Sequence, residues 1–139
     1  MKAQASFEYI LIVGAVLFFI VSGSMIIYNY SSRANDESMK ATINKAGNDI
    51  ISSITDVYYI GENSWETVKV TLPSNVINVS VPNNYEIVIR YDSRGGINDA
   101  VFFSDINITT SSNTIANHSG LVILKAASLG SSVNISEEG

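Results

Sequence analysis

The residues best suited to chemistry form a short polar run near the N-terminus. Gln4, Ser6 and Glu8 stand two positions apart, and residues 9–32 directly after them carry no charge at all. A carboxylate at the mouth of an apolar helix is costly to bury unless a cation meets it. Glu8 is therefore a candidate for pairing with a neighbouring amine, which would set the axial register between packed helices. The alternative is that Glu8 lies at the membrane interface, where the helix dipole favours an anion.

A second set of chemically distinctive residues is spread along the chain. Five asparagines stand in Asn-x-Ser/Thr sequons, the acceptor sequence for N-linked glycans: Asn29, Asn78, Asn107, Asn117 and Asn134. We expect Asn78, Asn107 and Asn134 to face outward from strands and Asn117 to lie in a loop. These four are the predicted glycosylation sites, because Asn29 lies close to the predicted membrane segment. Simple alternation of polar residues on solvated strands is the competing explanation.

Other kinds of site are not predicted. The chain has no Cys and one His, which excludes disulfides, thiolate nucleophiles and Cys-bound metals. His118 falls in a polar turn, and Asp92, Asn98 and Asp99 do not have the spacing of a calcium-binding loop. The net charge is -5 with scattered Lys and Arg, which argues against nucleic acid as a partner. We predict no catalytic residue, no metal site and no cofactor, so the protein is not expected to be an enzyme.

The uncharged stretch predicts a membrane-spanning helix. Residues 10–28 are almost entirely apolar and long enough to cross a hydrocarbon layer of about 30 Å. Aromatic residues flank this segment at both ends, as at membrane interfaces. A buried core helix and a cleaved secretory signal are the alternatives. The first would use up the whole core of a small domain, and the second has a leader with only Lys2 and a weak cleavage site.

The residues before this span carry a resemblance to a known family. The run Lys2-Ala3-Gln4-Ala5-Ser6-Phe7-Glu8-Tyr9, followed at once by an apolar helix, resembles the class III signal (Gln-x-Ser-x-Glu) of archaeal type IV pilins. The resemblance implies a leader of residues 1–3, removed by a prepilin peptidase between Ala3 and Gln4. It also implies that Gln4, Ser6 and Glu8 serve assembly. Ala3 replaces the Gly that is commoner before the cut. An archaellin is a further possibility, although its apolar segment usually begins in a Gly-rich sequence.

The rest of the chain predicts an α+β fold. The predicted helix covers residues 4–60, with the span or filament core at 7–30 and an amphipathic part at 31–60. In that second part Met39, Ile43, Ala46, Ile50, Ile54 and Val57 form one apolar stripe. Residues 62–139 change to a period of two and predict an extracellular antiparallel β-sheet or β-sandwich seated on the stripe. Strands are expected at 66–72, 76–81, 85–91, 100–103, 106–108, 121–126 and 133–135. Their inward residues are expected to include Ile77, Tyr85 and Tyr91.

Taken with the family resemblance, these patterns predict a structural protein. The expected function is that of a subunit of an archaeal type IV pilus-like surface filament, and the family resemblance implies a role in adhesion. Its expected partners are further copies of the chain in a helical filament, a prepilin peptidase, an assembly ATPase and a membrane platform. The expected location is the cell membrane for the precursor and the extracellular surface for the filament, with N-linked glycans as the only attached groups. The alternative is a single-span, membrane-anchored extracellular binding module that does not polymerise.

Overall fold

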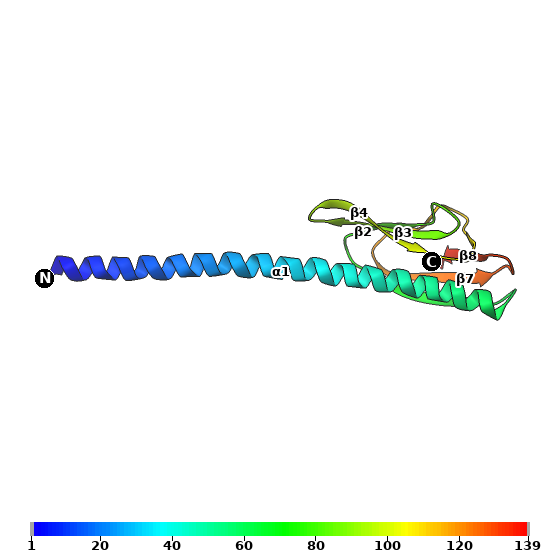
Figure 1. The fold of residues 1–139 in the computed structure, drawn as a ribbon, viewed down its shortest axis with the longest axis horizontal. Coiled ribbons are helices and arrows are strands. Elements are labelled where there is room, and N and C mark those ends of the chain that lie inside the picture. Colours follow the sequence, from blue (N-terminus) through cyan, green and yellow to red (C-terminus); the bar gives the residue numbers. More distant parts are fainter. Residues whose placement is uncertain (1, 139) are drawn as a thin grey trace. The chain divides into compact units, whose positions relative to one another are not determined.

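The structure is a computed structural model that describes residues 2–138, with side chains from residue 7 onward. It contains one helix, α1 (Lys2–Ile60), followed by eight strands (Figure 1). The chain divides into two compact units, Met1–Glu37 and Ser38–Gly139. The boundary lies within α1, so the described part of the first unit is helix alone, and the second unit combines the end of the helix with the described strands.

The helix ends where the sequence predicts, at a glycine. Gly61 adopts a φ of 115°, a conformation that side chains other than glycine rarely adopt, and its N–H donates to the carbonyl of Val57 at 3.3 Å. The hydroxyl of Ser64 donates to the carbonyls of Val57 and Gly61 at 2.7 and 2.6 Å. Carbonyls left without partners by the end of the helix are therefore satisfied by the turn that leads into the first strand.

The strands form two four-stranded sheets. Sheet A has the order β1-β7-β8-β5 and sheet B has the order β4-β3-β2-β6. The bounds are β1 Trp65–Leu72, β2 Val76–Ser80, β3 Glu86–Ser93, β4 Gly96–Phe103, β5 Ile108–Thr109, β6 Thr114–Ala116, β7 Gly120–Ser128 and β8 Val133–Glu137. All pairs are antiparallel except the short β5–β8 pair, which is parallel. The predicted α+β class, with a long helix packed on antiparallel sheets, is confirmed.

One hydrophobic core joins the two sheets to the second half of the helix. The buried hydrophobic residues of the helix are Ile43, Ala46, Ile50, Ile54 and Val57, which are five of the six in the predicted stripe. On the β4 side, Gly47 faces the ring of Phe102; on the β1 side, the buried Ser53 hydroxyl donates to Glu66 Oε2 at 2.9 Å. Strands β1 and β4 are the edge strands of their sheets. This part of α1 therefore packs along one open side of the sandwich and covers both edges.

Several details of the strand prediction are wrong. Strand β4 begins at Gly96 and not at residue 100, because Ser93 and Gly96 already pair across a tight turn, and β5 is Ile108–Thr109 and not 106–108. Ile77 is 41% exposed, because a bulge between Val76 and Asn78 shifts the register and turns Val76 inward instead. Tyr85 is 52% exposed, because β3 begins only at the next residue. The sequence also missed β6, a three-residue strand whose Ile115 and Ala116 are buried. Tyr91, by contrast, is half-buried and packs against the core as expected.

Candidate functional site

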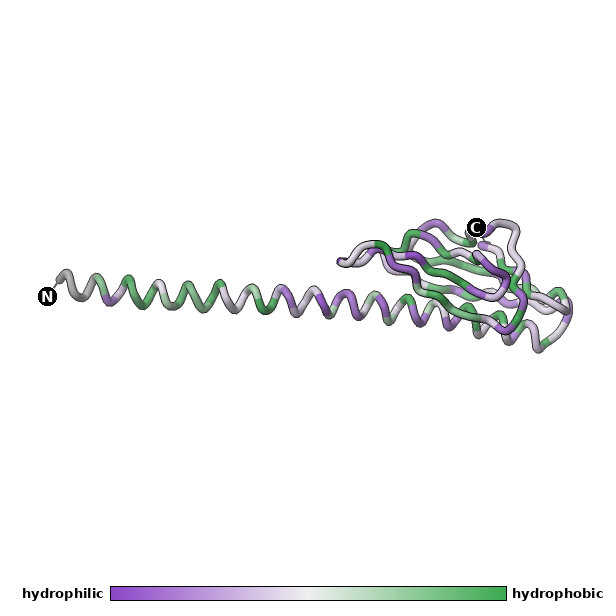
Figure 2. The backbone as a smooth tube through the Cα atoms, turned by 45° about the horizontal axis from the view of Figure 1, so that its top comes forward, coloured by the Kyte–Doolittle hydropathy of each residue, from purple (hydrophilic) through white to green (hydrophobic). Residues whose placement is uncertain are grey.

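The most distinctive surface of the first unit is apolar on every side of the helix. Large hydrophobic side chains from Phe7 to Tyr30 are exposed at successive positions around α1, including Phe18 and Phe19 at 69% and 74%. Figure 2 shows this part of the tube as largely hydrophobic, whereas hydrophilic and hydrophobic residues alternate along the later turns of the helix. Among the described residues, Phe7–Ile60 is the one helix long and apolar enough to cross a membrane. A helix that is apolar all round needs lipid or other helices around it.

Glu8 lies at the N-terminal end of this apolar surface and is itself exposed. With Phe7, Leu11 and Ile12 it lines an open hollow of about 440 Å³. The ion pairs found among the described residues are Arg90–Asp99 and His118–Glu137, so no cation of the described chain pairs with Glu8. Among the described side chains no cation compensates its charge, and solvent, a lipid headgroup or another molecule can do so.

The remaining residues of the polar run cannot be placed in the same way. Ala3, Gln4 and Ser6 belong to α1, but their side chains lie outside the described residues. Leader cleavage between Ala3 and Gln4, and the assembly roles of Gln4 and Ser6, therefore stay predictions.

The four predicted glycosylation sites have different surroundings. Asn117 is exposed in the loop before β7, and Asn78 and Asn134 are half-buried on β2 and β8, which are inner strands of their sheets. Asn78 does not lie between two inward residues, because the bulge turns Ile77 outward. The prediction that Asn107 faces outward from a strand is wrong, because β5 begins only at Ile108; Asn107 is half-buried, and its Oδ1 is buried without a hydrogen-bond partner in the described structure.

The polar groups singled out in the loops make local contacts. Asn98 Nδ2 donates to Ser93 Oγ and to the Gly96 carbonyl, both at 2.7 Å, within the tight β3–β4 turn. The Arg90 guanidinium donates twice to Asp99, at 2.7 and 2.9 Å, and these hydrogen bonds lower the pKa of the Asp99 carboxyl. The described residues contain no group of three or more His, Cys, Asp or Glu side chains arranged to hold a metal.

His118 links the loop before β7 to the last strand. Its Nδ1 lies 3.0 Å from the Ser119 carbonyl, and its Nε2 lies 2.6 Å from Glu137 Oε1. Only the imidazolium can donate to both oxygens at once, so the Ser119 carbonyl and, after it, Glu137 raise the pKa of His118. This arrangement ties two surface segments together and offers no nucleophile or substrate cleft.

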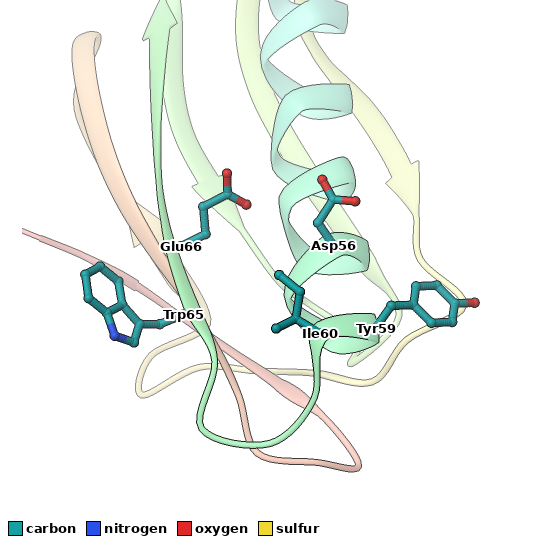
Figure 3. Close-up of a pocket in the computed structure, with 5 residues that line it drawn as sticks. All are labelled: Asp56, Tyr59, Ile60, Trp65 and Glu66. Carbon is teal, nitrogen blue, oxygen red and sulfur yellow. The ribbon is translucent and has the colours of Figure 1, made fainter.

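An open hollow of about 570 Å³ lies where the end of α1 meets β1 (Figure 3). Asp56, Tyr59 and Ile60 line it from the helix, and Trp65 and Glu66 line it from the strand. Figure 3 shows Glu66 on the helix side of the strand and Trp65 directed away from it. Neighbouring strand residues point to opposite faces, so these side chains do not converge on one ligand position.

The sequence interpretation passed over Trp65. Lys125 Nζ lies 4.8 Å from the centroid of its ring, a cation–π contact between β1 and β7. The alternation of residues along β1 could have revealed its position: Val68, Val70 and Leu72 point inward, so Trp65, an odd number of residues away from each, lies on the outer face. That its partner is Lys125 depends on strand pairing, which the pattern of one strand does not give.

No family model matches the chain, and comparisons with curated proteins and with solved structures likewise find no match.

Proposed function

We propose that this chain is a structural subunit of an archaeal type IV pilus-like surface filament, held together by its apolar N-terminal helix and serving adhesion. The observation that carries the proposal is the exposed, all-round apolar surface of α1 with the carboxylate of Glu8 at its N-terminal end. A lipid bilayer alone would accept the apolar surface. A carboxylate at the end of that surface, once other apolar helices cover it, favours a partner with a fixed cation, as a bundle of identical helices supplies.

The cation in this proposal is the N-terminal amine of an adjacent subunit. Removal of residues 1–3 by a prepilin peptidase would free that amine on Gln4. Glu8 then pairs with it only when two helices have the correct axial offset, so the pair selects one register among many that apolar packing allows equally. The membrane holds the precursor, and an assembly ATPase and a membrane platform move it into the filament.

The β domain is placed outside the cell in this proposal. The chain is rich in uncharged polar residues, with 20 Ser, 7 Thr and 14 Asn. Modification of the sequons in the β domain would require that this domain reach a glycosylation system outside the membrane. Adhesion is the role that the family resemblance supports, since the outer domains form the surface of such a filament.

The experiment is to shear surface filaments from the native cells and to measure the intact mass and N-terminal peptide of this protein. We expect a chain that begins at Gln4 in the sheared fraction. A chain that begins at the pyroglutamate form of Gln4 would support the filament but would contradict the pairing of Glu8 with an amine, because pyroglutamate carries no charge. A chain that begins at Met1 and occurs only in membranes would contradict the proposal and would support the anchored, non-polymerising module.

Variants at Glu8 test the register argument separately. We expect Glu8→Ala and Glu8→Gln to insert normally but to lower filament yield at least tenfold. Both variants leave the N-terminal amine of the adjacent subunit buried without a partner, which costs about 3–5 kcal/mol. Glu37→Ala is the matched control, since Glu37 is an exposed carboxylate of the same helix outside the apolar stretch. Normal yield from both Glu8 variants would show that the carboxylate sets no register.

A further inference from the structure

The outer face of sheet A places a sequon beside the tryptophan. In the register of the sheet, Trp65 on β1 lies opposite Ala127 on β7, and Ala127 lies opposite Asn134 on β8. These three residues form one row across three adjacent strands. Buried Val133 and Ile135 on either side of Asn134 direct its side chain to the outer face, where Trp65 is 62% exposed.

The middle of this row is nearly empty. Ala127 contributes only a methyl group, so no large side chain separates Asn134 from the indole ring. Two inter-strand steps amount to about 10 Å between the backbones. Lys125 Nζ of β7 lies over the ring, 4.8 Å from its centroid, and the Trp65 side chain is still 62% exposed, so a sugar would pack on the part of the indole that the ammonium leaves open.

The other predicted sites lack this arrangement. Asn78 is opposite Arg90, which is engaged by Asp99. Asn117 lies in a loop beside His118, and Asn107 has its Oδ1 buried. Among the four predicted sites, Asn134 is therefore the one with an exposed aromatic side chain in the same row of a sheet.

We propose that Asn134 carries an N-linked oligosaccharide whose first sugars pack across Ala127 onto the indole ring of Trp65. The apolar C–H face of a sugar ring stacks on an aromatic face, and Trp offers the largest such face. In the modification, Asn134 Nδ2 bonds to the anomeric carbon of an oligosaccharide supplied on a lipid phosphate. The bond from that carbon to the phosphate oxygen breaks, the lipid phosphate leaves, and the amide gives up one proton.

This inference rests on the proposed function in one respect, the placement of the β domain outside the membrane. The inference also assigns a role to Trp65, because the attached sugar covers an exposed aromatic ring. Among the outward residues of β1, β7 and β8, Trp65 is the one large aromatic side chain.

The test uses the full chain purified from its native cells, because Trp65 is its only tryptophan and reports its own surroundings. Mass spectrometry of the peptide that contains Asn134 should show a sugar. Acrylamide quenching of the Trp65 fluorescence should increase about twofold in Asn134→Gln, since a sugar stacked on the ring shields one of its two faces. Ser136→Ala destroys the same sequon but keeps Asn134, and it should give the same increase.

Asn117→Gln is the matched control, since it removes a sequon in a loop and should leave the quenching unchanged. An unmodified Asn134 would overturn the inference. So would a modified Asn134 whose loss leaves the quenching of Trp65 as it was. Neither readout depends on filaments: a filament subunit with a bare Asn134 would overturn only this inference, and a sugar-bearing chain found only in membranes would overturn only the filament.

Discussion

Gly47 is the residue at which a single methyl group should disturb the packing of α1 on the β domain. An added Cβ at this position would lie within 3.0 Å of three carbons of the Phe102 ring. The ring is half-buried and packs against the shared core, so it cannot turn aside without losing contacts. Gly47 thus marks a close approach of helix and strand, whereas a glycine seen in the sequence alone would suggest only a point of weakness in the helix.

The magnitude for Gly47→Ala follows from two opposing effects. Alanine in a helix interior is favoured over glycine by about 1 kcal/mol. Forcing a methyl group into a packed position costs about 1–3 kcal/mol. The net expectation is a loss of roughly 1 kcal/mol in the free energy of unfolding, which corresponds to about 4–8 °C in the melting temperature of a domain of this size.

The assay is thermal and urea unfolding of the full chain in detergent micelles, followed by Trp65 fluorescence and circular dichroism. Phe102→Leu in the Gly47→Ala background should remove the clash, giving a coupling energy of about 1–2 kcal/mol in a double-mutant cycle. Gly23→Ala is the control, because a Cβ there meets nothing within 4 Å. Stabilisation by Gly47→Ala alone, or additive effects in the cycle, would refute the close-packing argument.

Two further predictions concern surface ion pairs and pH. The Arg90 hydrogen bonds lower the pKa of Asp99 below its ordinary 3.8, so their stabilisation is present above that pH and disappears as pH falls through the lowered pKa. Asp99→Asn should flatten the acid limb of a melting-temperature profile, and an unchanged limb would contradict this. The pKa of His118 is raised above 6.5, first by the Ser119 carbonyl and then by Glu137, so its stabilisation is complete below 6.5 and is lost as pH rises through the raised pKa. His118→Gln should remove this loss on the alkaline side; a variant with the wild-type slope would show that the pair does not form in solution.

Much of the fold was accessible from the sequence because local periodicity is a one-dimensional signal. The apolar stripe from Ile43 to Val57 follows the 3.6-residue repeat, and the burial of Ile87, Ile89, Val122 and Leu124 follows the alternation of strands. The prediction failed where a local irregularity breaks the period. The bulge before Asn78 reverses the facing of Ile77, and β6 is too short to show a period at all.

The candidate site could likewise be predicted from the sequence only in part. The exposed apolar segment with Glu8 in it is legible in the sequence, because membrane length, absence of charge and one isolated carboxylate are properties of consecutive residues. Whether Glu8 pairs with a neighbour and whether Gln4 becomes the N-terminus stay predictions, since both concern events beyond one folded chain.

The sequence by itself determined the division into an apolar helix, an amphipathic helix and a β domain, because each depends on the order of side chains along a short stretch. Only the tertiary structure decided that Phe102 rests on Gly47 and that Trp65, Ala127 and Asn134 share a row. These residues are far apart in the chain, and strand pairing brings them together. Pairing is set by the fit of the whole core, which no segment of the sequence contains alone.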